Sequence, residues 1–230
     1  LNHLEYLLKQ VPINSQKLIV SETIFSMDGD FVDINSMRLL SEKYNCILYF
    51  DEAHSMGVYG NDGFGLASTK NKAEKEIIVG TFSKGFGSYG SFVSCSSLYL
   101  KKVINTCGGL IYSTVLPPSV LGSIYAAVKI MPKLSTLRDK LKENSAFMIG
   151  ELKKNKINIG GSNCHIIPII LNNVKSCERL KKFLLEESFF VKLIKTPTVP
   201  KGSERIRISL TATIEKKIIH KLIQTIQNFQ

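Results

Sequence analysis

The sequence predicts an α/β fold that is built on a large, mostly parallel β-sheet. Two continuous apolar runs, 46–50 (CILYF) and 77–82 (IIVGTF), are typical of parallel strands that are covered on both faces. A helical pattern at 35–44 precedes the first run, and strands that alternate with helices are typical of parallel sheets. We therefore expect a layered sheet domain in the first half of the chain.

Further elements follow the same reasoning along the chain. Strands are predicted at 17–22 (KLIVSE) and 91–96 (SFVSCS). After Pro117 and Pro118, a long helical stretch is predicted over about 119–154, with a break at Pro132. Beyond it the pattern predicts a smaller α+β unit, with strands at 165–171, 189–193 and 205–210 and helices at 176–187 and 214–229.

These patterns predict two domains. Residues 1–132 are expected to be the C-terminal part of the large sheet domain, and residues 133–230 a small C-terminal α+β domain. The chain starts with Leu1 rather than Met, inside an apparent helical pattern. We therefore expect further sequence upstream of Leu1.

The composition excludes several classes of protein. Of the 230 residues, 44% are hydrophobic and 21% are charged, and no run of 18 apolar residues occurs, so we expect no membrane span. The five cysteines are odd in number and lack CxxC spacing, which indicates reduced thiols in a cytoplasmic protein. Because His and Cys do not cluster, no metal site is predicted.

The net charge of +11 is concentrated in the second half of the chain. Residues 1–115 hold 10 Lys and Arg against 11 Asp and Glu, a net −1, whereas residues 116–230 hold 20 against 8, a net +12. The excess indicates either a surface for an acidic partner or lysines that are spread over solvated helix faces. No basic run contains interleaved aromatic residues, so nucleic acid is not an expected partner.

A DEAH run at Asp51–His54 follows the first apolar strand. The same letters occur in helicases, but those need an upstream GxxxxGK[ST] loop, which this sequence lacks. Because Asp51 ends a strand, its carboxylate is expected at the carboxyl edge of the sheet, where open α/β sheets bind ligands. His54 would lie on the same side of the following turn. The alternative is an ordinary aspartate that caps a helix.

Lys84 follows the second apolar strand, among small residues in the run 80–87 (GTFSKGFG). A lysine amine that is partly buried is nucleophilic, and the hydroxyls of Thr81 and Ser83 are suited to a phosphate. The run 85–90 spells GxGxxG, but a strand rather than a helix follows it, so it predicts a tight turn and not a dinucleotide site.

Three further residues complete this set. Ser26 follows the strand at 17–22 and is expected at the same sheet edge as Asp51. Arg205 and Arg207 alternate on a predicted strand and so face one side, where one of them would bind a carboxylate. The alternative is a solvated strand face. A lysine and an aspartate at strand ends, with a late arginine, predict chemistry based on pyridoxal phosphate (PLP), in which Lys84 forms a Schiff base.

The order of the motifs SMDGD, DEAH, GTFSKGFG, YST-x-LPP and PTVP-x-G-x-x-R-x-R resembles the α-oxoamine synthase family. The resemblance runs from about Leu1 to the C-terminus. It implies a fold-type I PLP-dependent transferase that condenses an amino acid with an acyl thioester and releases CO₂. In that family a residue that stacks on PLP, usually His, and a small-residue phosphate loop would lie before Leu1.

The resemblance also implies roles for single residues. Lys84 resembles the Schiff-base lysine, which also acts as general base, and Asp51 resembles the partner of the pyridine nitrogen. Ser26 and His54 resemble contacts to the phenolic oxygen, and Thr81 resembles a phosphate ligand. These residues are the expected cofactor site.

Substrate contacts and partners are implied in the same way. Arg207 resembles the carboxylate-binding arginine, and Thr198 lies in the substrate-side PTVP loop. Ser113 and Thr114 resemble a stretch that reaches the phosphate of a neighbouring subunit, which implies a homodimer with shared sites. The most similar member of the family joins L-alanine to a pimeloyl thioester, carried by CoA or an acyl carrier protein, in biotin synthesis. A sister enzyme of the family, a transaminase or a non-catalytic partner subunit is the alternative.

Overall fold

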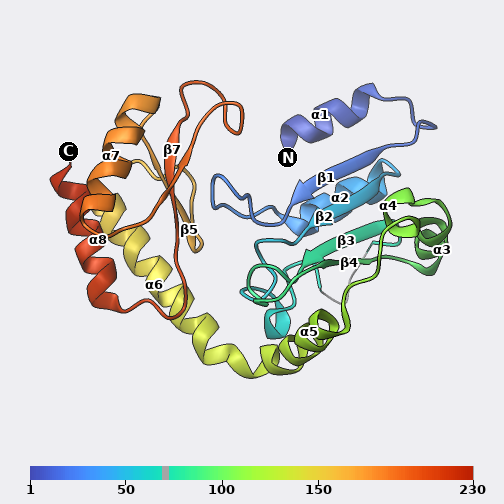
Figure 1. Cartoon of the computed structure of the whole chain (residues 1–230). Coiled ribbons are helices and arrows are strands. Elements are labelled where there is room, and N and C mark those ends of the chain that lie inside the picture. Colours follow the sequence, from blue (N-terminus) through green and yellow to red (C-terminus); the bar gives the residue numbers. More distant parts are fainter. Residues whose placement is uncertain (69–72, 230) are drawn as a thin grey trace. The chain divides into compact units, whose positions relative to one another are not determined.

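The computed structural model describes residues 1–68 and 73–229, which divide into two compact units (Figure 1). The first unit consists of Leu1–Ile24 and Val32–Ser135, and the second consists of Phe25–Phe31 and Thr136–Gln230. The short segment Phe25–Phe31 thus groups with residues that are distant in sequence. The predicted domains, 1–132 and 133–230, stay a prediction.

The first unit is built on a four-stranded sheet in the order β1-β2-β3-β4 (Figure 1). Strands β1, β2 and β3 are parallel, as the apolar runs predict. Strand β4 pairs antiparallel with β3, with Thr81 opposite Ser91, because the short connection between them leaves no room for a crossover helix. The bounds of these strands are β1 (Leu18–Glu22), β2 (Ile47–Asp51), β3 (Glu76–Thr81) and β4 (Ser91–Ser94).

Helices α1 (Asn2–Gln10) and α2 (Ile34–Lys43) supply side chains to the core of this sheet. Helix α2 begins at Asp33, whose side chain accepts a hydrogen bond from the Ser36 amide at 3.0 Å, as an N-cap does. Buried residues from both helices, three strands and the connections between elements form one cluster: Leu8, Ile19, Met37, Cys46, Leu48, Phe50, Ala67 and Ile78.

A buried ion pair joins α2 to β3 inside this unit. Arg38 donates from Nε and Nη2 to the two carboxylate oxygens of Glu76, each at 2.7 Å, and also donates from Nη2 to the Ala67 carbonyl at 2.9 Å. Both side chains are almost fully buried, with 7% and 1% of their surface exposed. This two-pronged geometry is the strong form of an arginine–carboxylate contact.

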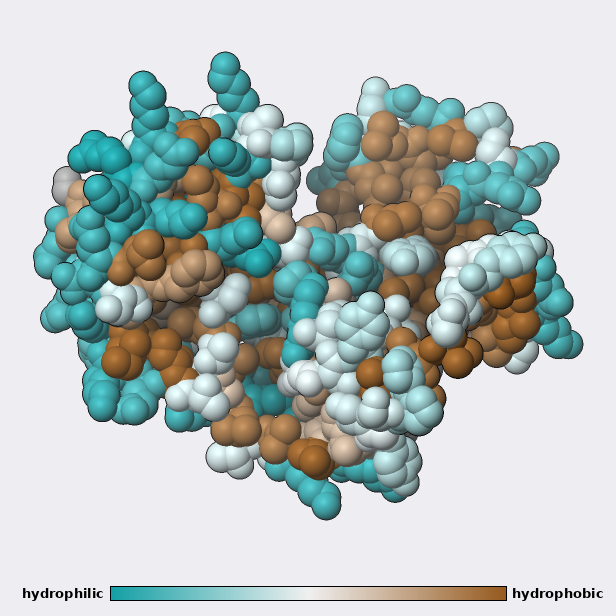
Figure 2. Space-filling view, in the orientation of Figure 1, coloured by the Kyte–Doolittle hydropathy of each residue, from teal (hydrophilic) through white to brown (hydrophobic). Residues whose placement is uncertain are grey.

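Three helices of the first unit contribute little to its core. No residue of α3 (Ser97–Thr106), α4 (Gly108–Ile111) or α5 (Pro118–Ile130) is buried, and α3 and α4 were not predicted from the sequence. Figure 2 shows hydrophobic surface on the side of this unit where Figure 1 labels α3. The large apolar side chains with the greatest exposure here are Leu98, Tyr112, Val115 and Tyr125.

The predicted long helix is interrupted near Pro132, as expected. Helix α5 ends at Ile130, a 3₁₀ turn covers Met131–Leu134, and α6 runs over Ser135–Lys154. Proline lacks the amide proton that an uninterrupted helix needs, which explains the change of geometry there. In the described part of the chain no helix is both long and apolar enough to cross a membrane.

The second unit is an antiparallel sheet in the order β5-β7-β6, with three helices around it (Figure 1). Strand β7 pairs with both neighbours, so Arg207 lies opposite Pro168 of β5 and Lys192 of β6. The apolar faces of α7 and α8 supply buried side chains, including Leu180 and Ile219. The remaining elements are β5 (Ile166–Ile170), α7 (Val174–Glu186), β6 (Lys192–Ile194), β7 (Arg205–Ser209) and α8 (Lys216–Asn228).

Candidate active site

The carboxyl edge of the sheet in the first unit carries the predicted chemistry. Asp51 is the last residue of β2, and Thr81 is the last residue of the neighbouring parallel strand β3. The Asp51 carboxylate accepts a hydrogen bond from the Ala53 amide at 2.8 Å, which fixes the start of the turn that carries His54. The sequence therefore places an acid and a histidine at one edge of the sheet.

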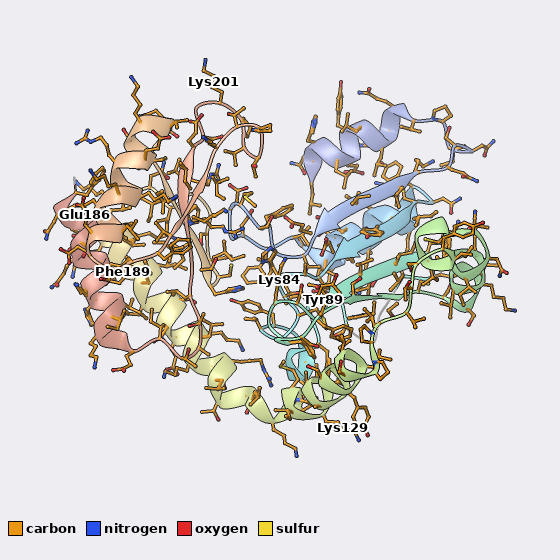
Figure 3. The ribbon with its side chains drawn as sticks, viewed as in Figure 1. Lys84, Tyr89, Lys129, Glu186, Phe189 and Lys201 are labelled. Atoms are coloured by element: carbon orange, nitrogen blue, oxygen red, sulfur yellow. The ribbon has the colours of Figure 1, made fainter. Side chains whose placement is uncertain are left out.

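Lys84 and His54 come together beyond this edge. The Lys84 Nζ lies 3.0 Å from the His54 Nε2. A lysine ammonium can donate to a neutral imidazole in this geometry, and a neutral amine can accept from an Nε2–H. The pair can thus hold one proton at either nitrogen. Figure 3 shows Lys84 on the connection between β3 and β4.

Two glycines allow this approach. A Cβ placed on Gly57 would lie 2.8 Å from the Gly85 Cα, and one placed on Gly85 would lie 3.0 Å from the Gly57 Cα. The backbone after His54 therefore packs directly on the backbone after Lys84. Gly57 also has a φ of +84°, a backbone conformation that residues other than glycine rarely adopt.

Gly57→Ala should separate the two catalytic candidates and destabilise the protein. Left-handed strain and overpacking together predict a loss of about 2–5 kcal/mol in unfolding free energy. Gly87→Ala is the matched control, because Gly87 has a φ of +62° but no atom within 4 Å of the added methyl group. Urea unfolding of both variants checks this, and an equal loss in both would show that the contact with Gly85 is unimportant.

Glu52 anchors the same turn from the opposite, buried side. It accepts from the Thr23 hydroxyl at 2.9 Å, from the Leu66 amide at 3.1 Å and from the Ala67 amide. Burial raises the pKa of Glu52, and these hydrogen bonds oppose the rise. The sequence analysis missed this role, although a carboxylate beside Asp51 on an alternating strand end must face the other way.

Thr81 and Ser83 place two hydroxyls at the end of β3. Their oxygens lie 2.8 Å apart, and the Ser83 amide donates to the Thr81 hydroxyl at 3.2 Å. The Thr81 hydroxyl is also 3.2 Å from the Gly90 carbonyl. These are donors of the kind that bind phosphate oxygens, close in sequence to Lys84.

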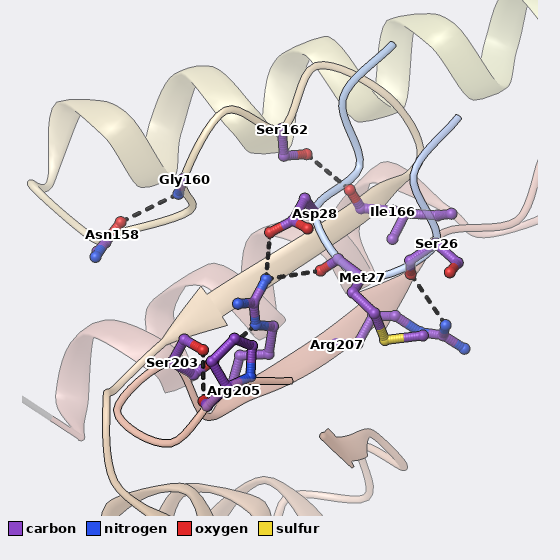
Figure 4. A network of polar contacts seen from close by, with 11 residues as sticks. Ser26, Met27, Asp28, Asn158, Gly160, Ser162, Ile166, Ser203, Arg205 and Arg207 are labelled. Carbon is purple, nitrogen blue, oxygen red and sulfur yellow. Dashed lines mark hydrogen bonds and ion pairs between the residues drawn. The ribbon is translucent and has the colours of Figure 1, made fainter. Parts of the chain in front are cut away.

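In the second unit, the two predicted arginines both reach the segment Phe25–Phe31 (Figure 4). Arg207 donates to the Ser26 carbonyl at 3.1 Å, and Arg205 forms a 2.5 Å ion pair with Asp28. Arg205 also donates to the Met27 carbonyl at 3.1 Å. Both guanidinium groups thus face one side of β7, as the alternation predicts. The sequence analysis treated Asp28 only as part of a turn and missed its ion pair.

Arg205 and Arg207 differ in how many N–H groups remain available to bind a ligand. Arg205 donates hydrogen bonds to the Asp28 carboxylate and to the backbone carbonyls of Met27 and Ser203. Its side chain is only 6% exposed. Arg207 has one hydrogen bond to a carbonyl, and its buried Nε lacks a hydrogen-bond partner among the described residues. Of the two, Arg207 therefore keeps more capacity to bind a carboxylate.

His165 borders the same arginine. Burial and the neighbouring positive charge of Arg207 lower the pKa of His165 to about 4. The folded protein therefore keeps His165 neutral at pH values at which an unfolded chain would protonate it. A neutral imidazole avoids adding a second positive charge beside Arg207.

This shift predicts acid sensitivity that depends on His165. Stability from the neutral form is fully present above about pH 6.5 and is lost as pH falls toward 4, a change of about 2–3 kcal/mol. His165→Gln should remove this component. The difference in unfolding free energy between the two proteins, measured from pH 7 to pH 4, reports it alone, and a difference that stays constant with pH would contradict the prediction.

The other predicted residues lie in exposed segments. Ser113 donates to the Leu110 carbonyl at 3.2 Å, and it and Thr114 are solvent-exposed in the first unit. Thr198 is exposed in the loop before β7, where its amide donates to the Lys195 carbonyl at 3.0 Å. Among the described residues of each unit, none of these three forms a hydrogen bond with the candidate residues above, so their roles stay predictions.

A family model for aminotransferase class I and II matches residues 1–226 of the chain. The chain belongs to the aminotransferase class I and II family. The match covers both units of the structure, including the end of β2 with Asp51 and the connection between β3 and β4 with Lys84. Membership confirms the predicted family of folds.

Curated relatives of this class I and II chain share a specific name. A protein of Magnetococcus marinus, provisionally named 8-amino-7-oxononanoate synthase, is 40% identical over 213 residues, which are 92% of this chain and 54% of the relative. A Bacillus anthracis protein with the same provisional name is 39% identical over 214 residues, again 92% and 54%. The chain therefore spans about half the length of the curated relatives it matches.

Solved structures with a similar fold include serine palmitoyltransferases and an 8-amino-7-oxononanoate synthase. The serine palmitoyltransferase of Sphingomonas wittichii has a TM-score of 0.90 at 26% identity, covering 98% of this chain and 57% of that one. An 8-amino-7-oxononanoate synthase from Francisella tularensis has a TM-score of 0.84 at 25% identity, covering 98% and 65%. A structure of SPT with PLP internal aldimine has a TM-score of 0.90 at 26% identity, covering 99% and 58%. The predicted resemblance and fold class are confirmed.

Proposed function

We propose that the chain is part of a PLP-dependent α-oxoamine synthase, an acyltransferase that joins an amino acid to an acyl thioester with loss of CO₂. The 3.0 Å contact between Lys84 and His54, beyond the strand end that carries Asp51, is the observation that carries the proposal. An amine, an imidazole and a carboxylate at one sheet edge are the groups that this reaction needs. The names of the relatives and of the similar structures support the same reaction.

The residues present fit PLP. The Lys84 amine can react with its aldehyde, Asp51 can keep the ring nitrogen protonated, and the hydroxyls of Thr81 and Ser83 can donate to its phosphate. His54 and Ser26 are the proposed contacts to its phenolic oxygen. When bound, PLP supplies an electron sink that stabilises negative charge at the α-carbon of the substrate.

The remaining steps belong to side chains of this chain. Lys84 takes the proton from the α-carbon of the amino acid as general base, and His54 can share that proton because the two nitrogens lie 3.0 Å apart. The α-carbon of the amino acid then forms a bond to the carbonyl carbon of the thioester as the bond from that carbon to sulfur breaks and the thiol leaves. The carboxyl group leaves as CO₂, and a proton takes its place on the α-carbon. His54 also offers an N–H to negative charge on the thioester oxygen.

We assign substrate recognition to the second unit. Arg207 is the proposed carboxylate ligand, because its hydrogen bond to the Ser26 carbonyl leaves other N–H groups of the guanidinium for two parallel bonds. Thr198 is the proposed contact from the loop before β7. The lysine-rich second half of the chain would attract an anionic carrier, either CoA or an acidic acyl carrier protein.

We further propose that the active form is a cytoplasmic homodimer with shared sites. Helices α3 and α5 bury none of their residues, and large apolar side chains such as Leu98 and Tyr125 are exposed, at 76% and 66%. An apolar surface of this kind marks a protein interface. Ser113 and Thr114 follow α4 in this exposed region and are the proposed contacts to the partner's phosphate.

Within the family, we propose 8-amino-7-oxononanoate synthase, with L-alanine and a pimeloyl thioester as substrates. The alternative is a sister enzyme such as serine palmitoyltransferase, 5-aminolevulinate synthase or 2-amino-3-ketobutyrate CoA ligase, which the structural similarity to serine palmitoyltransferase supports. A non-catalytic subunit is disfavoured because Lys84 and Asp51 are both present.

The test is release of CO₂ and free thiol by the PLP-loaded protein with pimeloyl-CoA and each of L-alanine, glycine and L-serine. We expect the highest rate with L-alanine. A higher rate with glycine or L-serine would assign a sister enzyme. Conversion of alanine without any thioester would indicate transamination, and no turnover with any amino acid would contradict the proposed activity of this chain.

A further inference from the structure

A basic pocket of about 500 Å³ lies on the second unit between α7 and β6. This volume is that of a typical ligand site, but the pocket is lined mostly by long charged side chains on an open surface. We call it the lysine pocket. Its basic and apolar lining residues are Lys181, Lys182, Lys192, Lys195, Leu185 and Leu193.

The positive charge of the lysine pocket is largely uncompensated. Among the described residues, no ion pair involves Lys181, Lys192 or Lys195, while Lys182 makes only a 3.9 Å contact with Glu186. Glu178 is the one carboxylate in the lining. Four like charges within one pocket repel one another, so an anionic partner would relieve that repulsion.

Apolar side chains also occur in this lining and close to it in sequence. Leu185 is 55% exposed within the lining, and Phe190, in the connection between α7 and β6, is 85% exposed. Apolar residues surrounded by charged ones are the usual anatomy of a protein-binding patch. A small inorganic anion would gain nothing from them.

The type of basic residue in the lysine pocket indicates which class of anionic partner it suits. The lining contains lysine and no arginine. Lysine acts as a mobile point charge, whereas arginine is the residue that grips a phosphate through two parallel hydrogen bonds. Several adjustable charges beside apolar side chains match carboxylates spread over a protein surface better than one phosphate group.

We propose that the lysine pocket is the docking surface for an acidic protein that presents an apolar side chain among its carboxylates. In the proposed reaction this protein is the carrier of the acyl thioester, so the identity of the partner rests on the proposed function. Charge would govern the rate of association, and Leu185 and Phe190 would supply apolar contact.

Charge reversal on the exposed rim tests the assignment. The probe is purified acyl carrier protein, and its affinity for the full chain is measured by fluorescence anisotropy over a series of KCl concentrations. We expect Lys192→Glu with Lys195→Glu to weaken binding by about 30-fold and to flatten its salt dependence. The matched control is Lys140→Glu with Lys153→Glu, two exposed positions of α6 in the same unit, for which we expect less than about 3-fold.

The results that would contradict the proposed docking surface are distinct from the expected one. Equal losses in the two double variants, an unchanged affinity in the pocket variant, or wild-type binding too weak to measure would overturn the docking surface. A matching loss of affinity for pimeloyl-CoA would reassign the pocket to phosphate groups and would also overturn it. Turnover of pimeloyl-CoA by the wild-type protein reports the proposed function separately, because it does not need the carrier protein.

Discussion

Replacing Lys84 with alanine should lower turnover by about 10²- to 10⁴-fold, the usual contribution of a general base. The physical reason is that His54 would keep its place but lose the amine that lies 3.0 Å from its Nε2. The rate of CO₂ release under saturating substrates measures the effect. Borohydride reduction of the PLP-loaded wild-type protein should add mass to the peptide that contains Lys84, and this is a readout independent of turnover.

Two controls separate chemistry from structure at this position. Lys84→Arg keeps a positive charge beside His54 but has no amine that can lose its proton, so it should be as inactive as the alanine variant. A small primary amine added to solution should restore part of the activity of Lys84→Ala and none of that of Lys84→Arg, whose side chain fills the space. If Lys84→Arg retained most of the activity, Lys84 would only hold a charge, and the proposed role would be wrong.

The second large effect concerns the buried ion pair that joins α2 to β3. Arg38→Met should lower the unfolding free energy by about 3–5 kcal/mol, because it leaves the Glu76 carboxylate buried without its partner. The Glu76 side chain is 1% exposed, and Arg38 binds both of its carboxylate oxygens. Chemical unfolding followed by circular dichroism measures the loss.

The same helix supplies a matched control. Lys43 also belongs to α2 and also lies 2.7 Å from a carboxylate, that of Glu5, but this pair is largely solvent-exposed. Lys43→Met should therefore change stability little, since water screens such pairs. Arg38→Met combined with Glu76→Leu should recover much of the loss, and failure to recover would mean that packing around Arg38, not the lone charge, causes the effect.

Much of the site follows from the position of residues at strand ends. Asp51 and Lys84 each come after a continuous apolar run, and parallel strands bring such ends to one edge of the sheet. That reasoning places the DEAH turn and the lysine near each other. It cannot give the 3.0 Å contact with His54, which depends on the backbone of Gly57 packing on that of Gly85.

Other features depend on contacts between residues that are distant in sequence. Apolar periodicity predicts β4 but not its antiparallel direction, because the side-chain pattern along a strand is the same in both directions. Helices α3 and α4 were not predicted, and the structure shows that neither buries a residue in the core. The ion pair of Asp28 with Arg205 joins a turn to the first residue of β7, two segments that local reasoning treats separately.

The grouping of Phe25–Phe31 with the second unit has a consequence for synthesis in the cell. The ribosome makes this segment well before two of its hydrogen-bond partners: Arg205 follows Met27 by 178 residues, and Arg207 follows Ser26 by 181 residues. Contacts of such long sequence separation form late and slowly. The nascent chain must therefore leave this segment without its arginine partners until β7 has been made, and a ribosome that stalls before β7 would release a chain in which Asp28 cannot form its ion pair with Arg205.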